Sequence, residues 1–183
     1  MREIGVKIKE LEKRALAHGF SHVSALRAGT LRPRPEVREM CGADKCQHFN
    51  KSWMCPPACG PLEENAKLLL GYSDGLIVQT TGDLDDDFDY ESMRDAGRLQ
   101  GRLFASFNKE LKGEYRSVLA LGNGCCGLCE KCAYPDGPCR KPDEATQSME
   151  AFGLVVSDVC RENGLGYYYG PRTITFTGCY LLK

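Results

Sequence analysis

Hydrophobic positions recur along the chain at helical spacing in some stretches and in short apolar runs in others. Near the N-terminus, Ile4, Ile8, Leu11 and Ala15 fall three or four residues apart with Lys and Glu between them, which predicts an amphipathic helix. The stretch "SHVSALRAGTL" then predicts a short strand that runs into a loop. After an irregular segment, "LEENAKLLL" predicts a second helix, which is expected to end at Gly71.

The middle of the chain continues to alternate strands and helices. The runs "DGLIVQTT" and "SVLALG" are short and apolar, which is typical of buried strands. Between them, apolar residues from about Tyr90 to Lys112 mark one face of a long helix, and Gly113 is expected to end it. A further helix is predicted near residues 148–163, and "GYYYGPRTITFTGCYLL" predicts two strands around a Gly-Pro turn.

This alternation predicts a single α/β domain over residues 1–183. Its helices are expected to flank a central, largely parallel sheet, and the closing pair of strands is expected to add an antiparallel C-terminal edge. Ligand sites in open sheets of this kind lie beyond the C-terminal ends of strands. The strand "SVLALG" leads directly into a cysteine-rich segment, which is therefore the expected place for a site.

Composition and charge exclude several classes of function. The 183 residues are 42% hydrophobic and 9% aromatic, which is enough for a core without disulfide staples. The formal net charge of −1 gives no electrostatic case for binding nucleic acid or anionic lipid. Apolar runs are too short to span a membrane, and the N-terminal helix lacks the features of a signal peptide. A cytoplasmic protein is therefore expected.

The chain contains eleven cysteines, most of them in two irregular segments at about 41–60 and 125–142. In a reducing cytoplasm, clustered thiols are more often metal ligands than disulfides, and the odd number of cysteines favours the same interpretation. The spacing is C-x4-C-x8-C-x3-C in the first group and C-x2-C-x2-C-x6-C in the second. The predicted ligands are Cys41, Cys46, Cys55 and Cys59 for the first group, and Cys126, Cys129, Cys132 and Cys139 for the second.

The compact spacing of the second group favours an iron–sulfur cluster. Three thiolates at positions i, i+3 and i+6 wrap a loop around one centre, and the fourth arrives after a short excursion. A cubane cluster needs one thiolate on each of four irons, whereas zinc more often takes two separated pairs of ligands. Zinc is the alternative for this group. For the first group, spacing alone does not decide between a cluster and zinc.

Arg140 follows the last cysteine of the second group and is a candidate cofactor-binding residue. A guanidinium beside Cys139 can donate a hydrogen bond to a cluster sulfur, and such donors tune the reduction potential. The competing interpretation is a surface salt bridge between Arg140 and Asp143 or Glu144. Sequence alone does not separate these two roles.

Four further residues have expected places. The spacing of the second group begins at Cys126, so Cys125 is expected to be a spare thiol and not a ligand. Trp53, in "SWMC", is expected to shield the first centre from water. Cys160 lies on the apolar face of a predicted helix and Cys179 in a predicted strand, so both are expected to pack in the core.

Four motifs together resemble an uncharacterised prokaryotic family that is described only as predicted metal-binding proteins. They are "WMCPPACG", "CCGLCEKCAYPDGPCRKP", "SMEAFG" and "GYYYGP", and the resemblance spans nearly the whole chain. It implies a cysteine-bound metal centre, iron–sulfur in kind, in small cytosolic proteins typical of anaerobes. It also implies that both cysteine groups are the ligands. No reaction comes with the resemblance.

The sequence therefore predicts an iron–sulfur protein with two [4Fe–4S] clusters that exchanges electrons with a redox partner, either a protein or a small molecule. One alternative is an enzyme that uses a labile iron of one cluster as a Lewis acid or reductant on a small substrate. Another is a zinc-stabilised binding module without redox chemistry. Whether the protein is an enzyme is left open.

Overall fold

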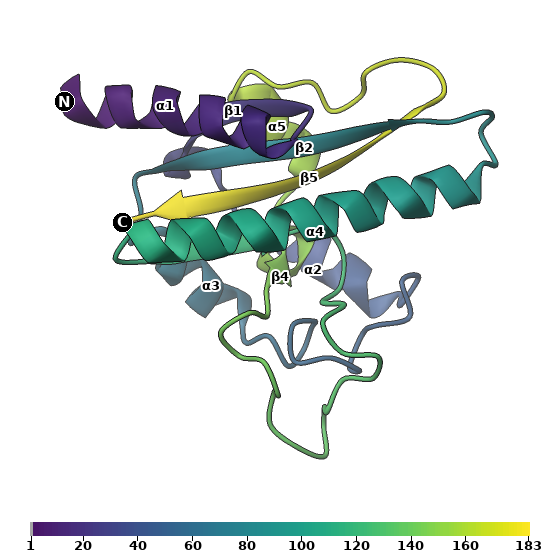
Figure 1. Cartoon of the computed structure of the whole chain (residues 1–183). Coiled ribbons are helices and arrows are strands. Elements are labelled where there is room, and N and C mark those ends of the chain that lie inside the picture. Colours follow the sequence, from purple (N-terminus) through teal and green to yellow (C-terminus); the bar gives the residue numbers. More distant parts are fainter. Residues whose placement is uncertain (1) are drawn as a thin grey trace.

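One five-stranded sheet organises the computed structural model, which describes the backbone of residues 2–183 and the side chains from Ile8 onward (Figure 1). Helices cover both faces of this sheet, and two long loops, at residues 41–61 and 123–146, lie beneath it in this view. The elements, in chain order, are α1 (Arg2–His18), β1 (His22–Arg27), the 3-10 turn η1 (Ala28–Thr30), α2 (Pro35–Gly42), α3 (Leu62–Leu69), β2 (Asp74–Asp83), α4 (Tyr90–Glu114), β3 (Val118–Gly122), β4 (Gln147–Ser148), the 3-10 turn η2 (Glu150–Phe152), α5 (Val156–Glu162) and β5 (Thr173–Leu182).

The sheet is mostly antiparallel, so the prediction of a largely parallel sheet is wrong. The strand order is β1-β2-β5-β3-β4, and only β3 and β4 pair in parallel. Strand β5 lies between β2 and β3 and is antiparallel to both, instead of forming an edge. Its second half, "TGCYLL", is buried throughout, as a central strand requires. The first strand of the expected closing pair is a loop, at residues 166–170.

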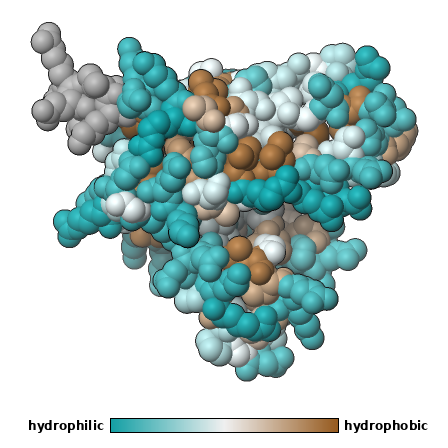
Figure 2. All heavy atoms as spheres, in the orientation of Figure 1, coloured by the Kyte–Doolittle hydropathy of each residue, from teal (hydrophilic) through white to brown (hydrophobic). Residues whose placement is uncertain are grey.

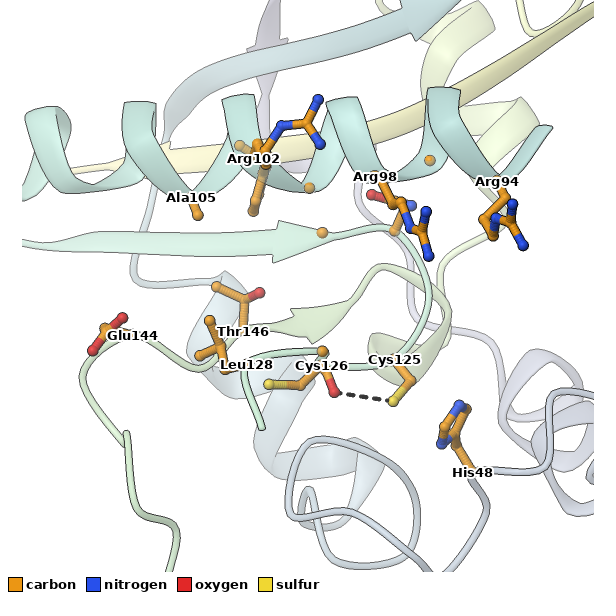
Figure 3. Close-up of a pocket in the computed structure, with 16 residues that line it drawn as sticks. His48, Arg94, Arg98, Arg102, Ala105, Cys125, Cys126, Leu128, Glu144 and Thr146 are labelled. Atoms are coloured by element: carbon orange, nitrogen blue, oxygen red, sulfur yellow. Dashed lines mark hydrogen bonds between the residues drawn. The ribbon is translucent and has the colours of Figure 1, made fainter. Parts of the chain in front are cut away.

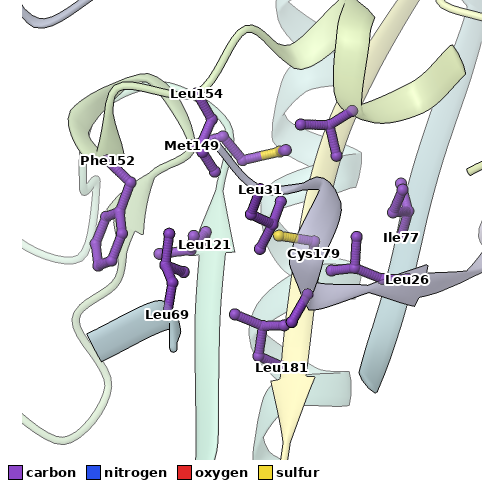
Figure 4. Packing of buried hydrophobic residues seen from close by; sticks show 12 residues of the cluster. Leu26, Leu31, Leu69, Ile77, Leu121, Met149, Phe152, Leu154, Cys179 and Leu181 are labelled. Atoms are coloured by element: carbon purple, nitrogen blue, oxygen red, sulfur yellow. The ribbon is translucent and has the colours of Figure 1, made fainter. Parts of the chain in front are cut away.

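Successive side chains of the central strands point to opposite faces of the sheet, so a hydrophobic core forms on each face. On one face, Leu76 of β2 and Tyr180 of β5 pack with residues of α1 and α4. On the other face, Ile77 and Leu181 pack with η2 and α5 (Figure 4). The sheet is therefore covered on both sides, which leaves its ends and connecting loops as places for a site.

Cys160 and Cys179 are fully buried, which confirms that both pack in the core. Burial raises the pKa of both thiols, so both are neutral in the folded protein. They lie on α5 and β5, away from the cysteine-rich loops. They can therefore serve as controls for experiments on the other nine cysteines.

The two long helices match their predictions. In α1, Leu11 and Ala15 are buried as expected, whereas the side chain of Ile4 lies outside the described residues. Helix α4 begins at Tyr90 and ends at Glu114, one residue beyond the expected glycine. The Asp89 side chain accepts a hydrogen bond from the backbone of the first turn of α4, which caps the helix. Within residues 2–183, no helix combines the length and the apolar character needed to cross a membrane.

The helix predicted near residues 148–163 is in fact two short pieces, η2 and α5. Gly153 separates them in the left-handed region, with φ of 73°. A Cβ at this position would lie 2.8 Å from the side chain of Leu62 and 2.9 Å from the carbonyl oxygen of Arg34. Glycine is therefore required here, and it ends the first piece in the way that glycine ends many helices.

Helix α2 lies in the segment that was expected to be irregular. Pro35 occupies its first turn and Glu36 follows, which are the residues that favour a helix start. This signal is present in the sequence, although it is surrounded by other prolines and cysteines. The consequence for the site is direct, because α2 carries Cys41.

We call residues 41–61 and 123–146 the cysteine lobe. These two stretches lie side by side beneath the sheet in Figure 1, although they are far apart in the sequence. The indole Nε1 of Trp53 donates a hydrogen bond to the carbonyl oxygen of Gly137 over 2.9 Å. The hydroxyl of Tyr134 donates to Oδ1 of Asn50 over 2.7 Å. The two stretches are thus bound to each other, and nine cysteines are brought into one region.

Candidate metal centres in the cysteine lobe

The second cysteine group surrounds a single small cavity of about 30 Å³ in the lobe. Residues 52–54, from the other stretch of the lobe, close it on one side, and Arg140 and Lys141 line it as well. The four predicted ligands that line it are Cys126, Cys129, Cys132 and Cys139. The four cysteines of the spacing C-x2-C-x2-C-x6-C therefore line one cavity.

Cys132 lies in an environment that favours its thiolate. Burial alone would raise its pKa, but backbone N–H groups of Tyr134 and Trp53 and the hydroxyl of Ser52 hydrogen-bond to the sulfur. Their combined effect lowers the pKa of Cys132 below its usual value. Donors of this kind also stabilise the sulfurs of a bound cluster.

Cys126 sits deeper in the same cavity. Burial raises the pKa of its thiol, whereas backbone N–H groups of Leu128 and Thr146 act in the opposite direction. The thiols of Cys139 and Cys129 lie close enough to raise this pKa further. Thiols that oppose one another's ionisation in this way are stabilised when a cation binds between them.

The first cysteine group comes together from a helix and a loop. Cys41 lies on α2, Cys55 and Cys59 are buried in the loop before α3, and Cys46 is exposed. Burial raises the pKa of Cys41, and the thiols of Cys46 and Cys55 add to this. Burial likewise raises the pKa of Cys59, with contributions from Cys55 and Cys41. The four predicted ligands are therefore electrostatic neighbours.

Cys125 belongs with the first group. A hydrogen bond from the Cys125 thiol lowers the pKa of Cys55 to about 7, and the hydroxyl of Ser52 contributes in the same direction. Both the interaction with Cys55 and burial raise the pKa of Cys125 itself, and Cys46 adds to this. The thiol that sequence spacing left over is therefore placed against the first group.

Arg38 supplies a positive charge to the first group. Its Nη2 donates to the carbonyl oxygen of Gly60 over 2.6 Å, and Nη1 donates to the carbonyl oxygen of Ala151. The fixed guanidinium acts against the effect of burial on the pKa of Cys41 and Cys59. Sequence reasoning missed Arg38. Its position three residues before Cys41 would have placed both on one helical face, had the helix been recognised.

Arg140 lines the cavity of the second group and is anchored by its own chain. Its Nη1 donates to the carbonyl oxygen of Lys131 over 3.0 Å. Among the described residues it forms no ion pair with Asp143 or Glu144, and Glu144 lies 4.0 Å from Lys141 instead. The guanidinium is thus held at the cavity, which is compatible with the cofactor-binding role expected for it.

Trp53 covers the second cavity, not the first group as predicted from its neighbour Cys55. The indole packs edge-on against Tyr134, with ring centroids 4.9 Å apart. This contact and the hydrogen bond to Gly137 draw the side chain across to the other stretch of the lobe. Neighbours in sequence therefore face different centres.

The two groups share a wall. Cys125 and Cys126 are consecutive residues, yet the first lies against Cys55 and the second lines the other cavity. The hydroxyl of Ser52 contacts one thiol of each group, Cys55 and Cys132. Ser52 is buried, with 3% of its surface exposed. The lobe is therefore one unit that contains two adjoining sets of thiols.

The donors at the second cavity are thiols. All eleven cysteines are free thiols, and no carboxylate or imidazole is among the described residues that line the second cavity. In the part of the chain with described side chains, no three His, Cys, Asp or Glu groups converge as ligands of one ion must. Arg140 and Lys141 suit a group of negative charge.

Fold and lobe together define a mixed α/β protein with a cysteine-rich lobe. The chain belongs to the family described as predicted metal-binding protein (DUF2284), which matches residues 24–182. This match confirms the metal-binding part of the resemblance and covers both cysteine groups. No curated protein and no solved structure matches the chain.

Proposed function

We propose that the protein holds an iron–sulfur cluster in each of the two thiol groups and works in electron transfer. The observation that carries this proposal is the shared wall: consecutive cysteines and one buried serine serve two adjoining sets of thiols. Clusters of this kind would supply one-electron chemistry. The redox partner, a protein or a small molecule, and a cytoplasmic location are parts of the same proposal.

The proposed ligands divide into the two sets already described. The second set is the one that lines the small cavity, with Arg140 as a positive neighbour. In the first set, Arg38 offsets part of the negative charge and the Cys125 thiol, which donates to the carbonyl oxygen of Cys126 over 3.2 Å, lies against Cys55. The ligands are Cys41, Cys46, Cys55 and Cys59 for the first centre, and Cys126, Cys129, Cys132 and Cys139 for the second.

Metal and sulfide analysis of anaerobically purified protein tests this function. We expect iron and acid-labile sulfide in equal amounts, enough iron for two clusters, and two signals that titrate with a one-electron reductant. Stoichiometric zinc without sulfide would contradict the proposal and favour the zinc-stabilised module. Anaerobic handling is required because iron–sulfur centres are lost by oxidation, so aerobically prepared protein is not a valid comparison.

Replacing Cys125 with alanine tests whether its thiol stabilises the charge of the first centre. We expect unchanged iron content and a reduction potential lower by a few tens of millivolts at one centre, because a hydrogen bond to sulfur is worth about 1 kcal/mol. A redox titration followed by electron paramagnetic resonance measures this shift. Cys125→Ser keeps a donor and should restore most of the potential. Loss of iron from Cys125→Ala would identify Cys125 as a ligand instead.

A further inference from the structure

A cleft of about 850 Å³ lies between α4 and the loop that follows β3 (Figure 3). One wall is the face of α4 that carries Arg94, Arg98 and Arg102. The opposite wall is the stretch from Asn123 to Leu128, at the top of the cysteine lobe. The space-filling view shows the surface hollowed between α4 and the lobe (Figure 2). The cleft is thus a separate space from the small cavity of the second group, and Cys125 and Cys126 lie in its wall.

The three arginines form a row. They are spaced four residues apart, so they repeat along one face of α4 about every 6 Å and span about 12 Å along the helix axis. Arg98 lies 3.5 Å from Asp95, and no ion pair forms at Arg94 or Arg102 among the described side chains. Like charges at this spacing weaken a helix. Pairing within the described side chains therefore offsets this cost at Arg98 alone.

A glycine keeps the space beside the row open. Gly97 and Gly101 both line the cleft, but a Cβ at Gly97 would lie 3.2 Å from the ring of Phe176, so packing explains that glycine. A Cβ at Gly101 would have nothing within 4 Å, so packing does not require glycine there. Glycine inside a helix is unfavourable relative to alanine. The small residue instead leaves room for something larger than water between the helix and the lobe.

The opposite wall adds hydrogen-bonding groups and little negative charge. Asn123 and Thr146 present polar side chains to the cleft, and His48 lies at its lower side in Figure 3. Glu144 is the one carboxylate among the described lining residues, and Lys141 lies 4.0 Å from it. Three arginines and one carboxylate thus line the cleft, in a protein whose formal net charge is −1.

We propose that this cleft binds a small, elongated polyanion with two or more phosphate or carboxylate groups. Guanidinium groups bind both kinds of anion with paired hydrogen bonds. A row of about 12 Å exceeds the reach of one anionic group, which favours an elongated ligand. The volume lies in the range of small-molecule sites, and the concave shape does not suit a nucleic acid duplex.

The cleft lies next to the two thiol groups, so a ligand bound there would be close to both. Cys125 and Cys126 line it, and each belongs to a different thiol group. A bound polyanion would therefore lie against the wall that the two proposed centres share. The role of the polyanion as a substrate or effector of the centres rests on the proposed function. Binding itself depends only on the cleft.

Calorimetry with tripolyphosphate and with citrate tests the proposal on the full chain, purified anaerobically and with its iron, sulfide and zinc measured. We expect one equivalent of at least one probe to bind, and the stronger probe identifies phosphate or carboxylate as the anion. Arg98→Gln should weaken binding at least about tenfold, since it removes a charged pair of hydrogen bonds. Arg116→Gln makes the same change of charge on an exposed arginine outside the cleft and should bind as the wild type does.

A second variant keeps every charge in place. Gly101→Leu fills the cleft and improves helix propensity, so it should fold and still bind at least about tenfold more weakly. The proposal is overturned if neither probe binds, if both variants bind like the wild type, or if Arg116→Gln weakens binding as much as Arg98→Gln. Protein that holds zinc without sulfide but binds a probe through Arg98 would keep this proposal and overturn only the iron–sulfur function.

Discussion

Replacing Cys129 with alanine is expected to remove one of two iron–sulfur signals and leave the other. Cys129 is half-buried and lines the cavity with the three other cysteines of the second group. Without its thiolate, one iron of a cubane would lack a protein ligand, and metal binding depends on the complete set. Iron and sulfide in anaerobically purified protein should fall to about half of the wild-type amounts. Electron paramagnetic resonance of the reduced protein should show a single remaining centre.

Cys160→Ala is the matched control for this experiment. Cys160 is fully buried on α5, outside the lobe, and contacts Gln79 and Thr177. Its replacement should leave both signals and the full iron content, because it removes a thiol without touching either set. If Cys129→Ala kept both signals, the second group would not hold a cluster. If it lost both, the two sets would not be separate centres.

Gly75→Ala is expected to destabilise the protein by about 3 kcal/mol or more. Gly75 lies on β2 and pairs with Leu181 of β5. A Cβ at this position would lie 2.0 Å from the carbonyl oxygen of Tyr180, a backbone atom of the neighbouring strand. Strand β5 cannot move aside, because β3 holds it on its other edge. The clash must therefore break pairing in the centre of the sheet.

Urea denaturation measures this effect, with the midpoint expected to fall sharply. Gly113→Ala provides the control: Gly113 is an exposed residue in the last turn of α4, and a Cβ there would have nothing within 4 Å. Alanine at this position should raise the free energy of unfolding by about 0.5 to 1 kcal/mol. Equal stability of the two variants would contradict the placement of β5 beside β2.

Local patterns predicted the long helices and the central strands but not their arrangement, and they missed α2. The apolar face of α4 and the runs of β2 and β3 are properties of neighbouring residues, so periodicity reveals them. The neighbours of β5 could not be predicted in this way. Nearby residues do not determine which earlier strands β5 pairs with, or whether the pairing is parallel or antiparallel. The buried run "TGCYLL" does indicate a strand covered on both faces. Such a run argues against an edge position for β5, but it does not show whether β5 is parallel or antiparallel to its neighbours.

The same limit applies to the site. Regular spacing identified the second cysteine group, because its four members lie in one short loop. Cys125 meets Cys55 only because two distant loops fold against each other, and spacing contains no trace of this contact. Trp53 is assigned to the second centre for the same reason. The arginine row on α4 was visible as a repeat, but the loop that turns it into a cleft was not.

The central position of β5 sets the order in which the protein can be assembled during synthesis. Strand β5 follows both cysteine groups in the chain, yet β2 and β3 have no partner between them until it arrives. All nine cysteines of the lobe leave the ribosome while the sheet is still open. The thiols are therefore exposed to the cell before their scaffold exists. Delivery of metal is consequently best timed after translation, when the closed sheet has fixed the lobe.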